Sequence, residues 1–251
     1  MSDGILLIHA FPLDARMWRP QVDALQASYT VVTPNLPGFG GAPPAGDVLS
    51  MGDAADRCLL ELDAAGCTAA VVCGLSMGGY VALELWRRAK GRIVGLVLAN
   101  TRAGADTDEG AAGRRALAER LRTEGSGFLV ESPPPLLSEA APDDLRTLVR
   151  GMIADQPAGS IAAAALGMAE RPDSTPDLAT VDVPALVITS TGDTLIPPEA
   201  TTPMAEQISN ADLEVIEGAG HLSNLEAPQR FNEALLRFLD RLDLQRSEDA
   251  F

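Results

Sequence analysis

The segment around Ser76 constrains the fold of this chain more than any other. An apolar run over residues 69–74 predicts a buried strand, and the sequence Gly-Leu-Ser-Met-Gly at 74–78 leads directly into a helical pattern over 77–90. A strand that reverses straight into a helix strains the turn residue, and glycines two before and two after the serine remove Cβ atoms that would clash. The pattern predicts a serine hydroxyl that projects above a sheet edge. The alternative is a glycine-rich turn whose serine only caps the helix.

Two further residues can complete a catalytic group with this serine. The chain has two histidines, His9 and His221, so a histidine base must be one of them. His221 and Asp193 each follow an apolar stretch that indicates a strand. Residues just past the carboxyl ends of parallel strands gather along one edge. A serine needs a base to take its proton, and an imidazole needs a carboxylate to fix its tautomer. The order Ser76, Asp193, His221 therefore predicts a catalytic triad.

Four ordered segments make the chain resemble the α/β-hydrolase fold family over about residues 5–242. They are the turn at Ser76, a Thr-Gly-Asp-x-x-x-Pro segment ending at Pro197, a Gly-x-Gly-His segment ending at His221 before an amphipathic helix, and the loop at 9–18. That loop is similar to the His-Gly-type loop after the third strand of the family. The resemblance implies an enzyme with an α/β fold.

The resemblance also implies an oxyanion hole, because acyl transfer passes through a tetrahedral oxyanion that preorganised donors must meet. The family uses the amide after the nucleophile and one amide of the early loop. These positions correspond to Met77 and Phe11. His9 is then expected to hold the loop by hydrogen bonds rather than to act as a base. Ala10 departs from the glycine common at its position, a change that the site can tolerate.

The apolar pattern predicts about six mainly parallel strands flanked by helices. Strands are expected near 5–9, 29–33, 69–74, 93–99, 184–190 and 212–216. Helices are expected near 14–26, 50–65, 77–90, 108–124, 142–156, 160–170, 198–209 and 226–242. The first two strands usual in the family are missing, so the strand near 29–33 should lie at a sheet edge. A helix, a loop or a second copy of the chain, in a homodimer, would cover that edge.

Residues 104–178 interrupt the alternation of strands and helices. They could be an ordinary helical insertion, but the resemblance implies a helical cap over Ser76, with the core formed by 1–103 and 179–251. Five apolar residues are expected to line the substrate pocket between cap and core: Trp18, Met152, Ile153, Leu166 and Met168.

Composition narrows the possible functions. The net charge of −16 argues against nucleic-acid binding, because phosphates would be repelled. The sequence has no apolar run long enough to span a bilayer and no signal-peptide pattern at its start. Three cysteines without metal-site spacing are interpreted as packing residues in a reducing cytoplasm. We therefore expect a cytoplasmic protein that uses neither a metal nor a cofactor.

The predicted function is hydrolysis of small carboxylic esters or lactones through an acyl-enzyme on Ser76. Carbon–carbon bond hydrolysis, perhydrolysis and a non-catalytic ligand-binding role on the same fold remain alternatives. Dehalogenases and epoxide hydrolases of the family use a carboxylate nucleophile, which Ser76 argues against. Asp106 and Asp108 are alternative acids, but Gly192 and Pro197 give Asp193 the family context.

The substrate is the least constrained part of the prediction. Residues 13–21 also look like the 3-oxoadipate enol-lactonase branch of the family. A carboxylate-bearing lactone would need a local cation, and Arg16, Arg102 and Arg171 flank the predicted site. The apolar cap residues favour a neutral group instead. We expect small neutral esters or lactones to be turned over more efficiently than dicarboxylate enol-lactones.

Overall fold

The computed structural model describes residues 2–242 and 244 of the 251-residue chain. Its six strands form one parallel sheet in the order β2-β1-β3-β4-β5-β6. The strands are β1 (Ser2–Ile8), β2 (Thr30–Val32), β3 (Cys67–Leu75), β4 (Ile93–Ala99), β5 (Ala185–Ser190) and β6 (Ala211–Ile216). The predictions of six parallel strands and of an edge strand near 29–33 are confirmed. That edge strand has only three residues, and a short edge offers few unpaired backbone groups.

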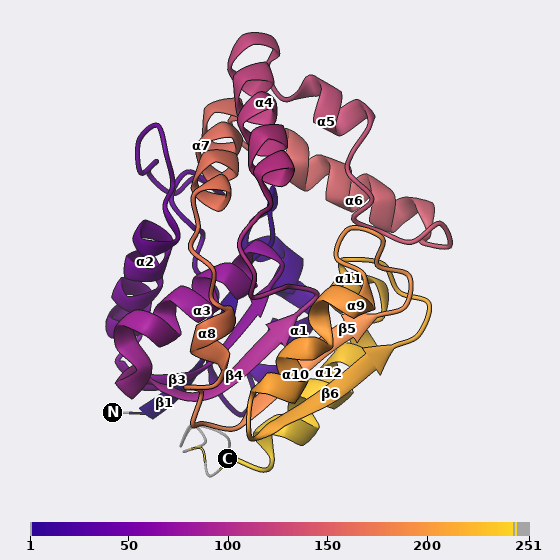
Figure 1. Cartoon of the computed structure of the whole chain (residues 1–251). Helices are drawn as coiled ribbons and strands as arrows, with labels where there is room; N and C mark the ends of the chain where they lie inside the picture. The colour runs from indigo at the N-terminus through magenta and orange to yellow at the C-terminus, as the bar shows by residue number, and fades with distance from the viewer. Residues whose placement is uncertain (1, 243, 245–251) are drawn as a thin grey trace.

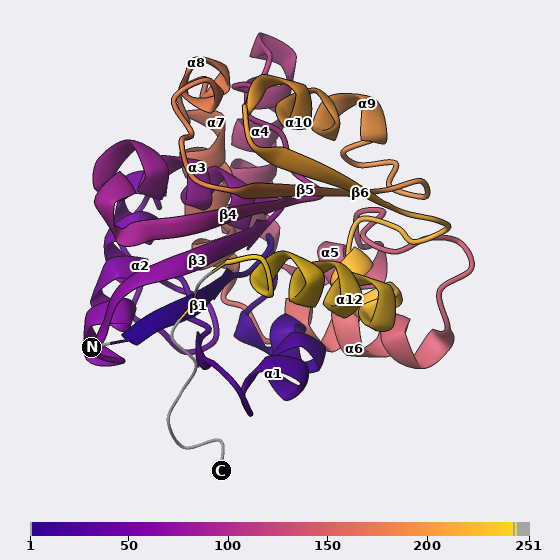
Figure 2. The ribbon, with the colours of Figure 1, turned by 90° about the horizontal axis from the view of Figure 1, so that it is seen from below.

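Helices cover both faces of the sheet. Figure 2 shows α1 and α12 on one side and α3, α9 and α10 on the other. The bounds of the core helices are η1 (Ala15–Trp18), α1 (Arg19–Leu25), α2 (Met51–Ala64), α3 (Met77–Ala89), η2 (Lys90–Arg92), α9 (Pro198–Thr201), α10 (Pro203–Gln207), α11 (Ser223–Glu226) and α12 (Pro228–Leu239). Because helices cover both faces, the central strands are apolar on both faces.

Prolines divide two of the expected helices. The helix expected near 198–209 is the pair α9 and α10, and the one expected near 226–242 is α11 followed by α12. Pro203 and Pro228 each stand at the first position of the second helix in the pair. A proline has no amide hydrogen to donate and its ring crowds the preceding turn, so each ends one helix and begins another.

Five helices lie between β4 and β5. They are α4 (Asp108–Glu124), α5 (Gly127–Glu131), α6 (Asp143–Ala154), α7 (Ala158–Ala169) and α8 (Thr175–Leu178). Figure 1 shows α4, α6 and α7 stacked over the sheet, on the side away from the two chain ends. We refer to α4–α7 and their connections as the insertion.

Helix α7 packs closely on a loop of the core. The amide of Leu49 donates to the carbonyl of Ala163 at 3.0 Å, and a Cβ atom on Gly167 would lie 1.6 Å from the carbonyl oxygen of Leu49. The glycine thus allows helix and loop backbones to meet.

We expect Gly167→Ala to lower the free energy of unfolding by about 1–3 kcal/mol or more, because backbone atoms must move to admit the methyl group. Gly159→Ala is the matched control, since that position of α7 has nothing within 4 Å of its added Cβ. Thermal or urea unfolding measures both variants. Equal stabilities would show that the close contact does not hold α7 in place.

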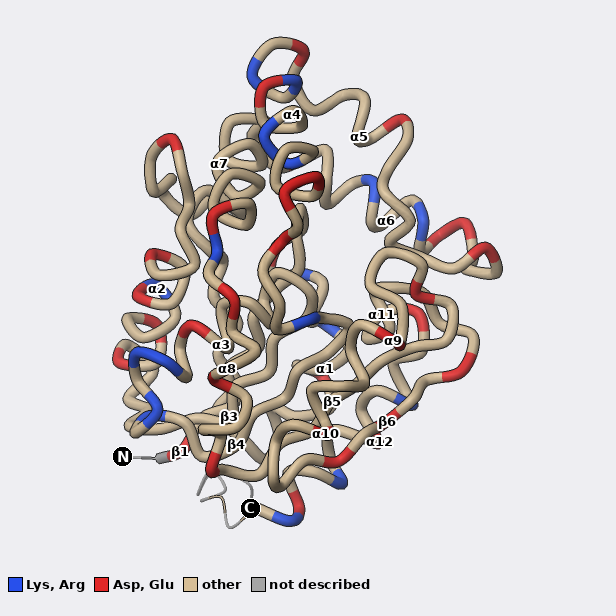
Figure 3. The backbone as a smooth tube through the Cα atoms, viewed as in Figure 1, with Lys and Arg blue, Asp and Glu red and all other residues tan. Residues whose placement is uncertain are grey.

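Charged residues are spread along the described part of the chain. Figure 3 shows Asp and Glu on every layer, with Lys and Arg interspersed among them. Acidic residues are therefore not confined to one part of the trace that the figure colours. Across the described residues, no helix combines the length and the apolar character needed to cross a membrane.

Candidate active site

Ser76 occupies a strained turn between β3 and α3. Its backbone has φ 57° and ψ −116°, a conformation that residues other than glycine rarely adopt. A Cβ atom on Gly74 would lie 2.1 Å from the carbonyl oxygen of Gly78, and one on Gly78 would lie 2.1 Å from that of Ile8. The two glycines thus permit the chain to reverse, as the spacing around Ser76 predicts. The Ser76 amide donates to the Ala99 carbonyl at 3.0 Å, which anchors the turn to the end of β4.

The structure brings His221 and Asp193 into direct contact. His221 Nδ1 lies 2.8 Å from Asp193 Oδ2, and both side chains are buried. His221 Nε2 is also buried and has no hydrogen-bond partner among the described residues. A ring held through Nδ1 with its other nitrogen unpartnered is arranged to exchange a proton at Nε2.

Hydrogen bonds hold Asp193 in its ionised form. Its Oδ1 accepts from the amides of Leu195 and Ile196, both at 2.9 Å, and its Oδ2 accepts from Asn100 as well as His221. Burial alone would raise the pKa of Asp193. The hydrogen bond and the charge of His221 lower that pKa, as do the hydrogen bonds from the Ile196 amide and from Asn100, and the pKa lies below its ordinary value. The carboxylate is therefore charged at neutral pH.

Asn100 is a residue of this site that the sequence reasoning missed. It directly follows β4 with φ 43°, and its Nδ2 donates to Asp193 Oδ2 at 2.9 Å and to Ser190 Oγ at 2.7 Å. Its Oδ1 accepts from Ser223 Oγ at 2.5 Å. The rule that singled out Asp193, a polar residue just past the carboxyl end of a strand, applies equally to Asn100.

The loop after β1 is held by His9, as expected. The His9 Nε2 accepts from the amide of Leu36 at 3.1 Å, and Nδ1 lies 3.1 Å from the carbonyl of Ala10. Burial lowers the pKa of His9 to about 4, so the ring is neutral at physiological pH and suits these two bonds. The amides of Phe11, in this loop, and of Met77, the first residue of α3, have no hydrogen-bond partner within the described part of the chain.

Ser76 opens onto a cavity of about 350 Å³. Core and insertion both line it: Phe11, Ser76, Tyr80, Arg102, Asp106, Gly110, Gly113, Arg114, Leu117, Pro134, Leu136, Met168, Leu195 and Ile196. Helix α4 contributes Gly110, Gly113, Arg114 and Leu117, and α7 contributes Met168. A substrate at Ser76 would therefore contact side chains of the insertion.

Of the five apolar residues expected in the pocket, Met168 lines this cavity and the other four do not. Trp18 is fully buried and packs against Phe231, with ring centroids 5.9 Å apart. Met152 and Ile153 are buried in the hydrophobic core, and Leu166 packs against it. The expectation for these four is corrected. The apolar stripe of α6 was predicted to face the substrate, but its residues Val149, Met152 and Ile153 belong to the buried hydrophobic core.

Asp106, the alternative acid, binds arginines and has no contact with a histidine in the described structure. Its side chain is 1% exposed and pairs with Arg102 at 2.5 Å, Arg114 at 2.5 Å and Arg171 at 3.0 Å. Burial would raise the pKa of Asp106, but the hydrogen bonds and charges of Arg114 and Arg171 hold it below its ordinary value. Asp108 is exposed at the start of α4.

The arginines expected near the site take different positions. Arg102 lines the cavity. Arg171 is buried and does not line it, and its guanidinium lies 4.0 Å from the ring centroid of Tyr80. Arg16 pairs with Asp14 and Asp155 instead. Arg114 lines the cavity although the sequence analysis did not name it. No sequence pattern marks Arg114 as a cavity residue, because arginines on the exposed faces of helices are common.

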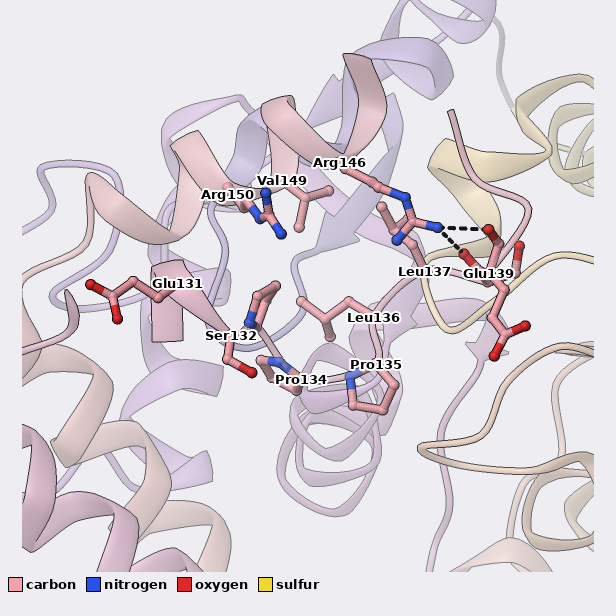
Figure 4. A pocket seen from close by; sticks show the side chains of 12 residues that line it. Glu131, Ser132, Pro134, Pro135, Leu136, Leu137, Glu139, Arg146, Val149 and Arg150 are labelled. Carbon is pink, nitrogen blue, oxygen red and sulfur yellow. Dashed lines mark hydrogen bonds between the residues drawn. The ribbon is translucent and has the colours of Figure 1, made fainter. Parts of the chain in front are cut away.

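A second cavity of about 430 Å³ lies between α6 and the segment 131–139 (Figure 4). Pro134 and Leu136 line both cavities, so this segment forms a wall between them. Arg146 lies on its rim, but Nη2 donates to the carbonyls of Ser138 and Glu139 at 2.8 and 2.9 Å. The second cavity contains neither Ser76 nor His221.

Among the described residues, no group of three or more His, Cys, Asp or Glu side chains is arranged to hold a metal ion. The chemistry that the described side chains offer at Ser76 is nucleophilic and acid–base.

Comparison with known proteins identifies the family. Residues 5–234 match the model of the alpha/beta hydrolase family, so the chain belongs to that family. Relatives include 3-oxoadipate enol-lactonase 1 from Acinetobacter baylyi, which is 30% identical over 95% of this chain and 89% of its own length.

Solved structures share the fold over nearly the full length. An esterase from Thermogutta terrifontis, solved with malate bound, is 39% identical with a TM-score of 0.91 and covers 96% of this chain and 92% of its own. The enol-lactonase from Burkholderia xenovorans LB400 is 28% identical with a TM-score of 0.83, over 96% and 92% of the two chains. The protein is therefore a hydrolase of the α/β fold with esterase and lactonase relatives.

Proposed function

We propose that the protein hydrolyses carboxylic esters or lactones through an acyl-enzyme on Ser76, with His221 as general base and Asp193 as its partner. The observation that carries this proposal is the buried His221–Asp193 pair, with Nε2 unpartnered, at the same sheet edge as the strained Ser76. A buried imidazole nitrogen without a partner costs stability, and a catalytic role explains why such a group is kept.

The proposed mechanism assigns one role to each of the three residues. His221 Nε2 takes the proton as Ser76 Oγ attacks the ester carbonyl, and the resulting imidazolium is stabilised by the Asp193 carboxylate. The imidazolium then returns the proton to the departing alkoxide as the carbon–oxygen bond breaks. Water, activated in the same way, hydrolyses the acyl-enzyme and releases the carboxylic acid. For a lactone, the alkoxide stays attached to the acyl group.

The amides of Phe11 and Met77 are the proposed oxyanion donors. Both lack a partner among the described residues, and Met77 is the first residue of the 13-residue helix α3. The amino end of a helix carries a partial positive charge that adds to the hydrogen bonds. Because both donors are backbone groups, the Phe11 side chain is left free to line the cavity.

The insertion acts as a cap in this proposal. Four residues of α4 and Met168 of α7 line the cavity at Ser76, so the insertion shapes the space for the substrate. The named relatives include an esterase and enol-lactonases, which supports either an open-chain ester or a lactone as substrate.

A panel of methyl esters, p-nitrophenyl esters and five- and six-membered lactones tests the proposal with the purified protein. We expect measurable turnover of at least one ester or lactone, and none of it in Ser76→Ala. Turnover that persists in Ser76→Ala, or ligand binding without any turnover across the panel, would favour the alternative of a non-catalytic ligand-binding protein or another chemistry.

A further inference from the structure

We propose that Arg102 and Arg114 form a subsite that binds a carboxylate of the substrate within the Ser76 cavity. The inference deepens the proposed function and rests on it, because it names the class of ester or lactone that the site prefers. Both arginines line the same cavity as the serine, Arg102 from the core after β4 and Arg114 from α4 of the insertion.

The cluster contains more positive charge than its own acid requires. Asp106 contacts three arginines, and neither Arg102 nor Arg114 forms an ion pair with another carboxylate among the described residues. One buried carboxylate needs one well-placed guanidinium to offset its charge. The remaining positive charge faces a cavity whose lining has no acidic residue besides Asp106.

Arg171 is the most deeply buried of the three arginines around Asp106. Its side chain is 3% exposed, and its guanidinium lies over the Tyr80 ring. Its Nη1 also donates to the carbonyl of Met168 at 2.8 Å and its Nη2 to that of Gly104 at 2.9 Å. Arg171 is therefore held in the interior through both of its Nη atoms, while its Nε has no partner among the described residues.

Arg102 and Arg114 keep unused donors. Arg102 reaches Asp106 through Nη2 alone, and its Nε is buried without a partner among the described residues. Arg114 reaches Asp106 through Nε and lies 3.5 Å from Met168 Sδ through Nη1, while no acceptor within the described structure meets its Nη2. Their side chains are 36% and 24% exposed, which leaves them accessible from the cavity. By contrast, Arg146 at the second cavity is bound to backbone carbonyls.

The apolar part of the cavity lining indicates what kind of chain joins the scissile carbonyl of the ligand to its carboxylate. Leu117, Leu136, Met168, Leu195 and Ile196 give apolar lining to the same cavity that holds Ser76 and the two arginines. A short aliphatic chain fits that wall, with the scissile carbonyl at Ser76 and a carboxylate at the guanidiniums. The ligand class is thus an ester or lactone of a dicarboxylic acid. This inference reverses the preference for neutral substrates that the cap residues suggested.

A purely structural role for the cluster would make different predictions. The ion pairs join α4 and the segment after α7 to the core, so loss of an arginine could weaken the protein without touching substrate choice. Such a role would lower the melting temperature and reduce turnover of charged and neutral esters alike.

The test uses monomethyl glutarate and methyl pentanoate, in which a methyl group replaces the carboxylate. We expect the wild-type enzyme to have the higher kcat/KM for the glutarate half-ester. In Arg102→Gln and Arg114→Gln, the ratio of kcat/KM for the charged over the neutral ester should fall about 10- to 100-fold. Arg114→Lys keeps the charge without the fork and should give an intermediate ratio.

Arg115→Gln is the matched control, because this exposed neighbour on α4 does not line the cavity. It makes the same charge change and should leave the ratio unaltered. A wild-type preference for methyl pentanoate, or an equal loss on both esters in the Arg102 and Arg114 variants, with or without a lower melting temperature, would overturn the subsite.

Direct binding of glutarate, measured by calorimetry, separates this proposal from the proposed function. If neither ester is turned over but glutarate binds and Arg114→Gln weakens it at least tenfold, the subsite stands and the hydrolase function fails. If esters are turned over but glutarate does not bind wild-type protein, the function stands and the subsite fails.

Discussion

Ser76→Ala should lower kcat for a hydrolysed ester by roughly 10³- to 10⁶-fold, because the acyl-enzyme can no longer form. His221→Ala should cause a loss of the same order, since the hydroxyl is a weak nucleophile without a base. The two residues act in one step, so the double variant should be no slower than the slower single variant. Burst and steady-state kinetics with p-nitrophenyl acetate measure all three proteins.

A serine outside the proposed site provides the control. Ser132 lines the second cavity rather than the cavity at Ser76, so Ser132→Ala should keep wild-type kinetics. Near-normal turnover in folded Ser76→Ala protein would refute the mechanism. Additive losses in the double variant would instead mean that the serine and the histidine act independently.

Asp193→Asn should lower kcat by about 10³- to 10⁴-fold while leaving the fold intact. The amide has nearly the shape of the carboxylate, but it carries no charge to stabilise the imidazolium and favours the wrong tautomer of His221. Asp193 Oδ2 lies 2.8 Å from His221 Nδ1, so replacement of this acid should change the orientation and basicity of the imidazole more than replacement of any other.

Asp106→Asn is the comparison that decides between the two acids. Asp106 contacts three arginines, so its loss should lower stability and disturb substrate preference more than the acyl-transfer step. Single-turnover acylation by p-nitrophenyl acetate, which has no carboxylate to bind the arginines, reports on that step. A larger loss of acylation rate in Asp106→Asn than in Asp193→Asn would reverse the assignment.

The sheet and the strand-end residues were predictable because their signals are local. An apolar run followed by Gly-Leu-Ser-Met-Gly allows few conformations, and the structure places Ser76 at φ 57° between strand and helix. The parallel order of the strands then brings Asp193 and His221 to one edge, where they hydrogen-bond. The same rule would have identified Asn100 had it been applied to every strand.

The cavity lining was not predictable in the same way. Helical periodicity shows that Met152 and Ile153 share an apolar face, but it does not show whether that face meets substrate or core. Here the core covers it. Arg114 and Asp106 are eight residues apart and come together with Arg171 only when α4 and α7 pack. Such pairings depend on tertiary contacts that no short sequence window contains.

Covalent labelling with a fluorophosphonate tests the central proposal most directly, because the reagent phosphonylates only an activated serine. Intact-mass measurement followed by peptide mapping should find one adduct per chain, located on Ser76. The adduct should be absent from Ser76→Ala and should form far more slowly in His221→Ala. An adduct on another residue, or no adduct on folded protein that turns over esters, would contradict the account.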